Sequence, residues 1–279
     1  METFRLPSGA PVPRLGQGAW QIGEDQRRHA EELRALNVGI ELGLTLIDTA
    51  EMYGNGGSEQ LVAEAIAGRR AQVYLVSKVL PSNASRRGTV AACERSLARL
   101  KTDYLDLYLL HWRGSYPLEE TFGAFTTLIE RGLIRHYGVS NFDCADLDEA
   151  SALPGGERIA ANQVLYNLEE RGIEWDVLPR CRERGVPIMA YSPLGSDRMR
   201  LRTHPALRAV AARRGVSASR VALAWLLRAP GVVVIPKASK EAHVRDNHAA
   251  LELELSAADL AELDAAFPPP RRATPLAMI

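Results

Sequence analysis

Cysteine is scarce in this chain, and its few thiols follow no metal-binding or disulfide pattern. Cys93, Cys144 and Cys181 are odd in number, widely separated and outside any CxxC pair. Secreted disulfide scaffolds and cysteine-rich metal sites use paired, closely spaced thiols, so the sequence argues against both classes. The chain shows no other metal-ligand spacing. We therefore expect reduced, buried thiols, a cytoplasmic location and no bound metal.

An excess of one charge and long apolar runs are also missing. Lys and Arg together number 34, as do Asp and Glu, so the formal net charge is zero. This balance argues against a nucleic-acid partner, because nucleic-acid-binding proteins are usually basic. No apolar run reaches the roughly 18 residues needed to cross a bilayer, and METFRLPSGAPVPR lacks the apolar core of a secretory signal. We expect neither a nucleic-acid nor a membrane partner.

The length and the apolar content are those of one sizeable domain. The chain has 279 residues, and 46% of them are apolar. A parallel (β/α)₈ barrel usually needs roughly 250 residues. No linker, low-complexity segment or sequence repeat interrupts the chain. The sequence therefore predicts a single domain spanning residues 1–279.

Short apolar runs alternate with helical stretches along the sequence. The runs are typical of strands that are buried on both faces of a parallel sheet. The expected strands lie near residues 15–18, 45–48, 73–77, 104–110, 136–140, 160–164, 187–191 and 232–235. The expected helices lie near 28–42, 58–68, 88–100, 118–131, 173–184, 219–228, 239–250 and 256–267. This order predicts an α/β fold, a (β/α)₈ TIM barrel with an extra helix at the carboxyl end.

Local features refine this prediction at the two ends and at one helix start. Pro7-Ser8-Gly9 lies between short extended pieces and predicts a β-hairpin within residues 3–14. Ser58, with Glu59 after it, is expected to cap the helix that begins there. Residues 268–272 are expected to form an extended arm on the surface. The loops after His111 and Tyr191 are short, so neither predicts a deep lid.

Several predicted strands end in a polar residue, as expected for the catalytic face of a parallel barrel. Asp48, Lys78 and His111 end three such strands, and Tyr53 follows on a loop. A carbonyl that accepts hydride needs a proton donor. Tyrosine, with a pKa of about 10, is a reluctant donor unless an ammonium stabilises its phenolate. A carboxylate can hold that ammonium, and an imidazole can orient the substrate oxygen.

Each of these four residues also has a plain structural alternative. Asp48 could cap the next turn, and Tyr53 could be a loop aromatic. Lys78 could be a solvated lysine that leaves a strand, and His111 could be a histidine at the barrel rim. Four such groups at the ends of consecutive strands favour the catalytic interpretation of the set.

Seven segments, in order along nearly the whole chain, resemble the aldo-keto reductase family. They are GIELGLTLIDTAEMYGNGGSE, VYLVSK, DYLDLYLLHW, YGVSNF, NQVLYN, AYSPLG and IPKAS. The short loops, together with GQGAW, IDTAEMYG and HWRGS, are most similar to bacterial members of the methylglyoxal-reductase type, which reduce small aldehydes. The resemblance implies a (β/α)₈ barrel that binds an extended nicotinamide cofactor at its carboxyl face. The chain accordingly lacks a strand–GxGxxG–helix signature, since Gly54-Asn55-Gly56-Gly57 is a loop.

Matched position by position, the resemblance implies a role for each site residue. Tyr53 is the proton donor, Lys78 and Asp48 tune it, and His111 orients the carbonyl. The implied cofactor residues are Ser140, Asn141 and Gln163 at the carboxamide, Tyr191 stacked on the nicotinamide, Ser192 and Leu194 at the pyrophosphate, Lys237 at the adenosine 2′-phosphate and Asn247 at the adenine. Trp20 and Trp112 are implied to line the substrate mouth, with core packing as the alternative for each.

The phosphate-binding segment departs from the family pattern. Ala238 stands where the family often has Ser, and Ser239 comes next. His243 stands where the family often has Arg. We therefore expect Lys237 and Ser239 to give a moderate preference for NADPH, with NADH bound more weakly and protonated His243 adding to the preference at low pH. Alternatively, Arg245 supplies the missing charge and makes the preference large.

Together these features predict an NADPH-dependent, monomeric reductase that converts small aldehydes, methylglyoxal among them, to alcohols. One alternative is a cofactor-binding regulatory subunit of a membrane channel, with the same fold and little turnover. Another is a barrel lyase that uses Lys78 as a Schiff base. No long loop follows Phe267, so we expect an open mouth that favours small reactive aldehydes over bulky steroids.

Overall fold

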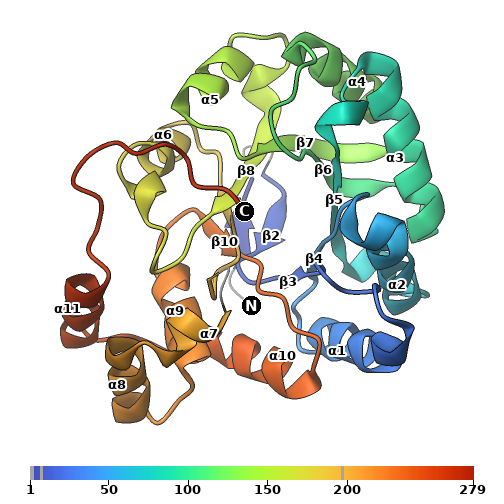
Figure 1. Cartoon of the computed structure of the whole chain (residues 1–279). Coiled ribbons are helices and arrows are strands. Elements are labelled where there is room, and N and C mark those ends of the chain that lie inside the picture. The colour runs from blue at the N-terminus through green and yellow to red at the C-terminus, as the bar shows by residue number, and fades with distance from the viewer. Residues whose placement is uncertain (1–2, 7–8, 196–197) are drawn as a thin grey trace.

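Eight parallel strands form the centre of the fold in the computed structural model, which describes residues 3–6, 9–195 and 198–279 (Figure 1). The strands are β3 (Gln17–Gly18), β4 (Leu46–Asp48), β5 (Tyr74–Val79), β6 (Leu105–Leu110), β7 (Ile134–Ser140), β8 (Ile159–Leu165), β9 (Ile188–Tyr191) and β10 (Val232–Val234). Each strand pairs with its neighbours in sequence order. Bridges from Leu15 to Val234 and from Gly18 to Lys237 join the first strand to the last. The prediction of a (β/α)₈ barrel is confirmed.

An antiparallel hairpin of β1 (Thr3–Arg5) and β2 (Pro11–Pro13) precedes the barrel, with Phe4 opposite Val12. Leu6 and Val12 are buried together with apolar residues of the barrel strands, such as Leu46 and Leu107. The hairpin is confirmed, although Pro7 and Ser8 of its expected turn lie outside the described residues.

Helices surround the strands (Figure 1). They are α1 (His29–Glu41), α2 (Gly57–Ile66), α3 (Arg86–Leu100), α4 (Leu118–Glu130), α5 (Cys144–Ser151), α6 (Val177–Glu183), α7 (Arg198–Thr203), α8 (Pro205–Arg214), α9 (Ala218–Leu227), α10 (Glu241–His248) and α11 (Ala257–Ala266). Short polar side chains begin several of them by satisfying free backbone N–H groups. Ser85 caps α3 in this way, and Ser256 forms a reciprocal capping box with Asp259 at the start of α11. The extra helix at the carboxyl end is therefore confirmed.

Two apolar layers hold the barrel together. The inner layer fills the barrel with strand residues such as Val76, Leu109 and Val233. The outer layer lies between the strands and the helices, and Leu75 and Phe125 belong to it. Because adjacent residues of a strand face opposite layers, most of the strands place apolar residues on both faces. The polar residues at the strand ends therefore stand out against an apolar background.

Three helices, α5, α7 and α8, lie in stretches that the sequence pattern does not single out as helical. Helices α5 and α7 have only 8 and 6 residues, and α8 buries only Leu207, Val210 and Ala211 among its 10, so none of the three has a clear apolar periodicity. The predicted helix start at residue 173 is also wrong. A separate 3₁₀ turn spans Gly172–Glu174, and α6 begins only at Val177, whose N–H donates to the Asp176 carboxylate.

Ser58 does not cap α2, so that prediction is wrong. The N-cap is Gly56, whose φ of +90° glycine adopts without strain. The Ser58 hydroxyl instead donates to the Ala19 carbonyl at 2.9 Å and lies 2.9 Å from Thr49 Oγ1. The Ser58 hydroxyl therefore makes tertiary hydrogen bonds in place of the expected helix cap.

The chain after α11 returns across the carboxyl end of the barrel (Figure 1). Residues 268–272 lie outside any helix or strand and are mostly exposed, as expected for a surface arm, although the chain bends at Arg271 and Arg272. The continuation does not stay on the outer surface, because Met278 and Ile279 line the central cavity. The expectation of a mouth left open after Phe267 is therefore wrong: a segment without periodicity gives no local sign of where it packs.

Candidate active site

A cavity of about 320 Å³ lies at the carboxyl ends of the barrel strands. This volume is at the lower end of the roughly 300–1,000 Å³ typical of small-molecule sites. The predicted residues that line it are Trp20, Asp48, Tyr53, His111, Trp112, Ser140, Asn141, Gln163, Tyr191, Ser192, Leu194 and Lys237. The fold thus gathers residues from seven strand ends and their loops around one space.

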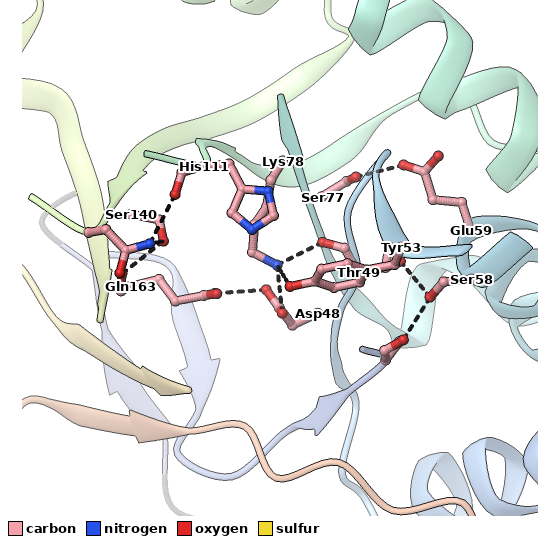
Figure 2. Close-up of polar contacts among 12 residues, drawn as sticks. Asp48, Thr49, Tyr53, Ser58, Glu59, Ser77, Lys78, His111, Ser140 and Gln163 are labelled. Atoms are coloured by element: carbon pink, nitrogen blue, oxygen red, sulfur yellow. Dashed lines mark hydrogen bonds and ion pairs between the residues drawn. The ribbon is translucent and has the colours of Figure 1, made fainter. Parts of the chain in front are cut away.

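Lys78 lies behind this cavity at the centre of a buried polar cluster (Figure 2). Its Nζ donates to Asp48 Oδ2 at 2.7 Å, to the Thr49 carbonyl oxygen at 2.9 Å and to the Tyr53 hydroxyl at 3.1 Å. Three acceptors match the three N–H bonds of an ammonium. Burial alone would lower the pKa of Lys78, but Asp48 and Tyr53 raise it above its ordinary value. Lys78 is therefore a fixed cation at neutral pH.

An unusual loop directs Tyr53 toward Lys78. The three residues that follow it, Gly54, Asn55 and Gly56, all have positive φ, at 55°, 52° and 90°. Glycine adopts this left-handed conformation freely, and asparagine tolerates it better than most residues. The chain turns sharply after β4, and the Lys78 Nζ lies 4.8 Å from the centre of the Tyr53 ring. The Gly-Asn-Gly sequence is thus what allows Tyr53 to reach the cluster.

The Tyr53 hydroxyl remains protonated in this environment. Burial raises the pKa of Tyr53 above its ordinary value, and the Lys78 ammonium opposes that rise. Sequence reasoning gives the sign of the Lys78 effect correctly but misses that burial outweighs it. A protonated hydroxyl beside a permanent cation can release its proton without leaving an isolated buried charge.

His111 is a neutral imidazole at the cavity wall. Burial, reinforced by the Lys78 charge, lowers the pKa of His111 to about 2. Its Nδ1 is buried without a hydrogen-bond partner among the described residues. Its ring lies 5.8 Å from the Tyr53 ring, centre to centre, in an edge-on arrangement. A neutral imidazole next to the tyrosine hydroxyl can donate a hydrogen bond to a carbonyl oxygen without adding charge.

Residues that sequence reasoning missed support this cluster from behind (Figure 2). Thr49 supplies a carbonyl acceptor to Lys78, and its hydroxyl meets that of Ser58. Ser77, next to Lys78 on β5, donates to Glu59 Oε1 at 2.7 Å. A usable signal is present, because Thr49 and Ser77 are polar residues inside apolar runs. Their partners on α2 become visible only in the fold.

A second polar group joins the cluster to the far wall of the cavity. Gln163 Nε2 donates to Asp48 Oδ1 at 2.8 Å, so the Asp48 carboxylate is held on both oxygens and does not serve as a helix cap. Ser140 Oγ donates to the Gln163 carbonyl oxygen, and Asn141 Nδ2 donates to that hydroxyl. The Tyr191 hydroxyl donates to Asn141 Oδ1 at 2.9 Å. Gln163 Oε1 has no hydrogen-bond partner within the described chain, so it can accept from an amide such as a carboxamide.

The remaining predicted cofactor residues divide between the rim and the outside of the cavity. Ser192, Leu194 and Lys237 line the rim, and Ser192 has a φ of +45°. Ser239, His243 and Asn247 do not line it. The side chain of His243 is exposed on α10, and Asn247 is buried on the same helix.

Aromatic and methionine side chains border the mouth of the cavity. Trp20 is 39% exposed and lines the cavity, so core packing, the alternative for this residue, is not what the structure shows. Trp112 also lines it, and its ring lies 4.8 Å from that of His111. Met52 and the carboxyl-terminal Met278 add two further apolar walls that were not predicted. The mouth is therefore apolar and partly covered.

Within the described part of the chain, no three His, Cys, Asp or Glu side chains are arranged to hold a metal ion. The cysteines are free, with Cys93 and Cys181 buried and Cys144 half-buried. Across the same residues, every helix is too short or too polar to cross a bilayer.

Comparison with known proteins gives a consistent match over nearly the whole chain. The model of the aldo/keto reductase family matches residues 14–267. Methylglyoxal reductase YeaE of Escherichia coli (strain K12) is 53% identical over 271 residues, which cover 96% of this chain and 95% of that protein. Glyoxal reductase of Bacillus subtilis (strain 168) is 33% identical over 265 residues, covering 95% and 92%.

Solved structures resemble the fold equally closely. An aldo-keto reductase from Klebsiella pneumoniae, crystallised in complex with NADPH, superposes with a TM-score of 0.97 at 48% identity and covers 100% of this chain and 99% of its own. A Klebsiella pneumoniae structure with NADP and acetate gives a TM-score of 0.96, also at 48% identity, and covers 99% of both chains.

Proposed function

Because the chain belongs to the aldo/keto reductase family, we propose that it is an NADPH-dependent reductase of small aldehydes, with methylglyoxal among its substrates. The activities named for its similar relatives and the cofactor bound in the Klebsiella structures support this assignment. The observation that carries it is the Lys78 ammonium, which contacts both the Asp48 carboxylate and the Tyr53 hydroxyl beside the cavity.

The chain's own residues supply the acid for this reaction. Reduced nicotinamide, when bound, supplies the hydride that attacks the carbonyl carbon. As negative charge develops on the carbonyl oxygen, Tyr53 donates its proton and an alcohol forms. The Lys78 ammonium stabilises the phenolate left on Tyr53, and Asp48 keeps that ammonium in place. Neutral His111 donates a hydrogen bond that orients the carbonyl oxygen.

The donors and acceptors on the far wall fit the nicotinamide end of the cofactor. Gln163 Oε1 would accept from the carboxamide, Ser140 and Asn141 would hold its other edge, and Tyr191 would support the ring. Ser192 and Leu194 would meet the pyrophosphate at the rim, and Asn247 would lie toward the adenine. Lys237 would face the adenosine 2′-phosphate.

The cavity favours small carbonyl compounds. The cavity has a volume of about 320 Å³, and the nicotinamide would occupy part of it. Met278 and Ile279 also line this cavity and leave less room for the substrate. Bulky steroids would find little further apolar surface, whereas an aromatic aldehyde could pack on Trp20 and Trp112.

Two other functions receive less support. A Schiff-base lyase needs an uncharged amine, but the pKa of Lys78 is raised and its ammonium already has three acceptors. A regulatory subunit with little turnover would not need Asp48, Tyr53 and Lys78 in contact. We further propose that residues 1–279 act as one domain and as a monomer. We also propose a cytoplasmic location, which the free thiols support, and no nucleic-acid partner, which the balanced charge supports.

A carbonyl panel tests the proposal directly. Loss of reduced-nicotinamide absorbance would be followed with methylglyoxal, a substituted benzaldehyde and a steroid ketone, each with NADPH and with NADH. We expect the highest kcat/KM with a small aldehyde and NADPH. Higher kcat/KM with the steroid ketone, no turnover of any carbonyl, or borohydride labelling of Lys78 by the substrate would contradict it.

A further inference from the structure

The proposed 2′-phosphate site around Lys237 and Ser239 lacks an arginine that the aldo-keto reductase family often has at the position of His243. His243, at the position of that arginine, has an exposed side chain. Arg245 is directed elsewhere: its Nε and Nη2 donate to Glu241 Oε1 at 2.9 and 2.8 Å. Neither residue of α10 therefore places a positive side chain beside Ser239, and the alternative that Arg245 supplies the missing charge is not supported.

A different arginine, from the opposite end of the sequence, reaches the same site. Arg28 is the residue at the start of α1, and its Nη2 donates to Ser239 Oγ at 2.7 Å. The contact joins residues 211 positions apart in the chain. It is possible because the barrel closes between β3 and β10, which brings α1 against α10 (Figure 1).

Arg28 is held in place but not enclosed. Its Nη2 also pairs with Glu32 Oε1 at 3.1 Å, and the buried Glu32 carboxylate accepts from the Gly23 N–H at 2.9 Å through its other oxygen. The Arg28 side chain is 42% exposed. Its Nε and Nη1 have no partner among the described residues, so three N–H donors of the planar fork remain available.

We infer that Arg28 binds the adenosine 2′-phosphate of NADPH and is a main determinant of the preference for NADPH over NADH. Its free N–H groups offer the paired contact to phosphate oxygens that histidine cannot make. Arg28 contacts Ser239, and Ser239 follows the rim residue Lys237 by two positions in the chain, so this site offers a phosphate a guanidinium, a hydroxyl and an ammonium. This inference rests on the proposed cofactor.

Binding measurements without a carbonyl substrate test the role of Arg28 separately from the identity of the cofactor. Dissociation constants for NADP⁺, NAD⁺ and 2′-AMP would be measured by titration of protein fluorescence in wild type, Arg28→Met, Arg28→Lys and Arg27→Met. Arg27 is the matched control, because it is the neighbouring arginine, pairs with Asp25 and is 89% exposed. If the wild type binds NADP⁺ no better than NAD⁺, the proposed cofactor fails before any variant is considered.

We expect Arg28→Met to raise the Kd for NADP⁺ and 2′-AMP about 10- to 100-fold, the size of one charge-assisted contact, with the Kd for NAD⁺ changed less than about threefold. Arg28→Lys keeps a positive charge beside Glu32 but loses the planar guanidinium, so we expect an intermediate loss of affinity for NADP⁺. Unchanged NAD⁺ binding shows that the variants are folded. An unchanged NADP⁺/NAD⁺ ratio in Arg28→Met, an equal loss for both cofactors, or the same loss in Arg27→Met would overturn the inference. So would a loss of preference in His243→Ala or Arg245→Ala instead.

Discussion

The two ends of the site are built in opposite ways. Around Lys78, the Asp48 and Thr49 side chains are buried, and the ammonium has all three of its acceptors within the protein. At the corner of Arg28 and Ser239, the guanidinium is partly exposed and keeps three N–H groups without a partner among the described residues. A buried cluster whose hydrogen bonds are all formed fixes the reacting groups before the substrate binds. An accessible group with unused N–H donors can instead form hydrogen bonds with a ligand. We therefore expect variants around Lys78 to change kcat and variants of Arg28 to change the preference for NADPH over NADH.

The largest expected effect is on chemistry, from Tyr53→Phe. The variant keeps the ring and removes only the hydroxyl, so cofactor binding should survive while kcat falls about 10²- to 10⁴-fold. Tyr74→Phe is the matched control, since Tyr74 lies on the same strand as Lys78 and its buried hydroxyl has no partner among the described residues. Near-normal kcat in Tyr53→Phe would rule out Tyr53 as the acid.

The next effect is on stability, from Lys78→Met. Removing the ammonium leaves the buried Asp48 carboxylate without its cation, which typically costs about 3–5 kcal/mol of unfolding free energy. The double variant Lys78→Met/Asp48→Asn should recover much of that loss and stay inactive. Arg28→Met should be much less destabilising, because Arg28 is partly exposed and Glu32 keeps its bond from Gly23. Urea unfolding would measure the free energy of unfolding of the three variants. Equal losses in Lys78→Met and Arg28→Met would contradict the difference between the buried cluster and the exposed arginine.

A smaller effect is expected at the mouth. Met278→Ala removes an apolar wall that is about half exposed, so the loss should be about 1 kcal/mol, or roughly fivefold in KM, for a benzaldehyde. The KM for methylglyoxal, which is too small to use that wall fully, should change less. An equal change for both aldehydes would show that the tail acts on the cofactor or on the fold.

An effect of similar size, spread over a range of pH, is the contribution of His111 to stability. Its folded-state pKa of about 2 lies below the ordinary value near 6.5, so the unfolded chain binds more protons between these limits. The His111 contribution is therefore present above about pH 6.5 and is lost as pH falls. From about pH 6.5 to pH 5.5 it should decrease by about 1 kcal/mol in wild type and not in His111→Gln, as urea unfolding at each pH would measure. Identical pH dependence in the two proteins would mean that His111 is not buried as a neutral group.

The sequence predicts the chemical end of the site better than the cofactor-specific end, for a physical reason. Asp48, Lys78 and His111 could be placed because strand ends of a parallel barrel share one face, and Gly54-Asn55-Gly56 indicates a loop after Tyr53. The Gln163–Asp48 and Arg28–Ser239 contacts span 115 and 211 residues and leave no local pattern. Ser58 shows how a local preference misleads, because the tertiary partners Thr49 and Ala19 take the hydroxyl that a helix cap would have used.

The measurement that tests the account most directly is a double-mutant cycle on kcat with Tyr53→Phe, Lys78→Met and both together. The central claim is that Lys78 acts through the Tyr53 hydroxyl, as one proton-donating unit. Residues that act as a unit are strongly non-additive, so the double variant should be no slower than the slower single variant, within about threefold. If the two losses multiply instead, Lys78 and Tyr53 act independently and the account of the site is wrong.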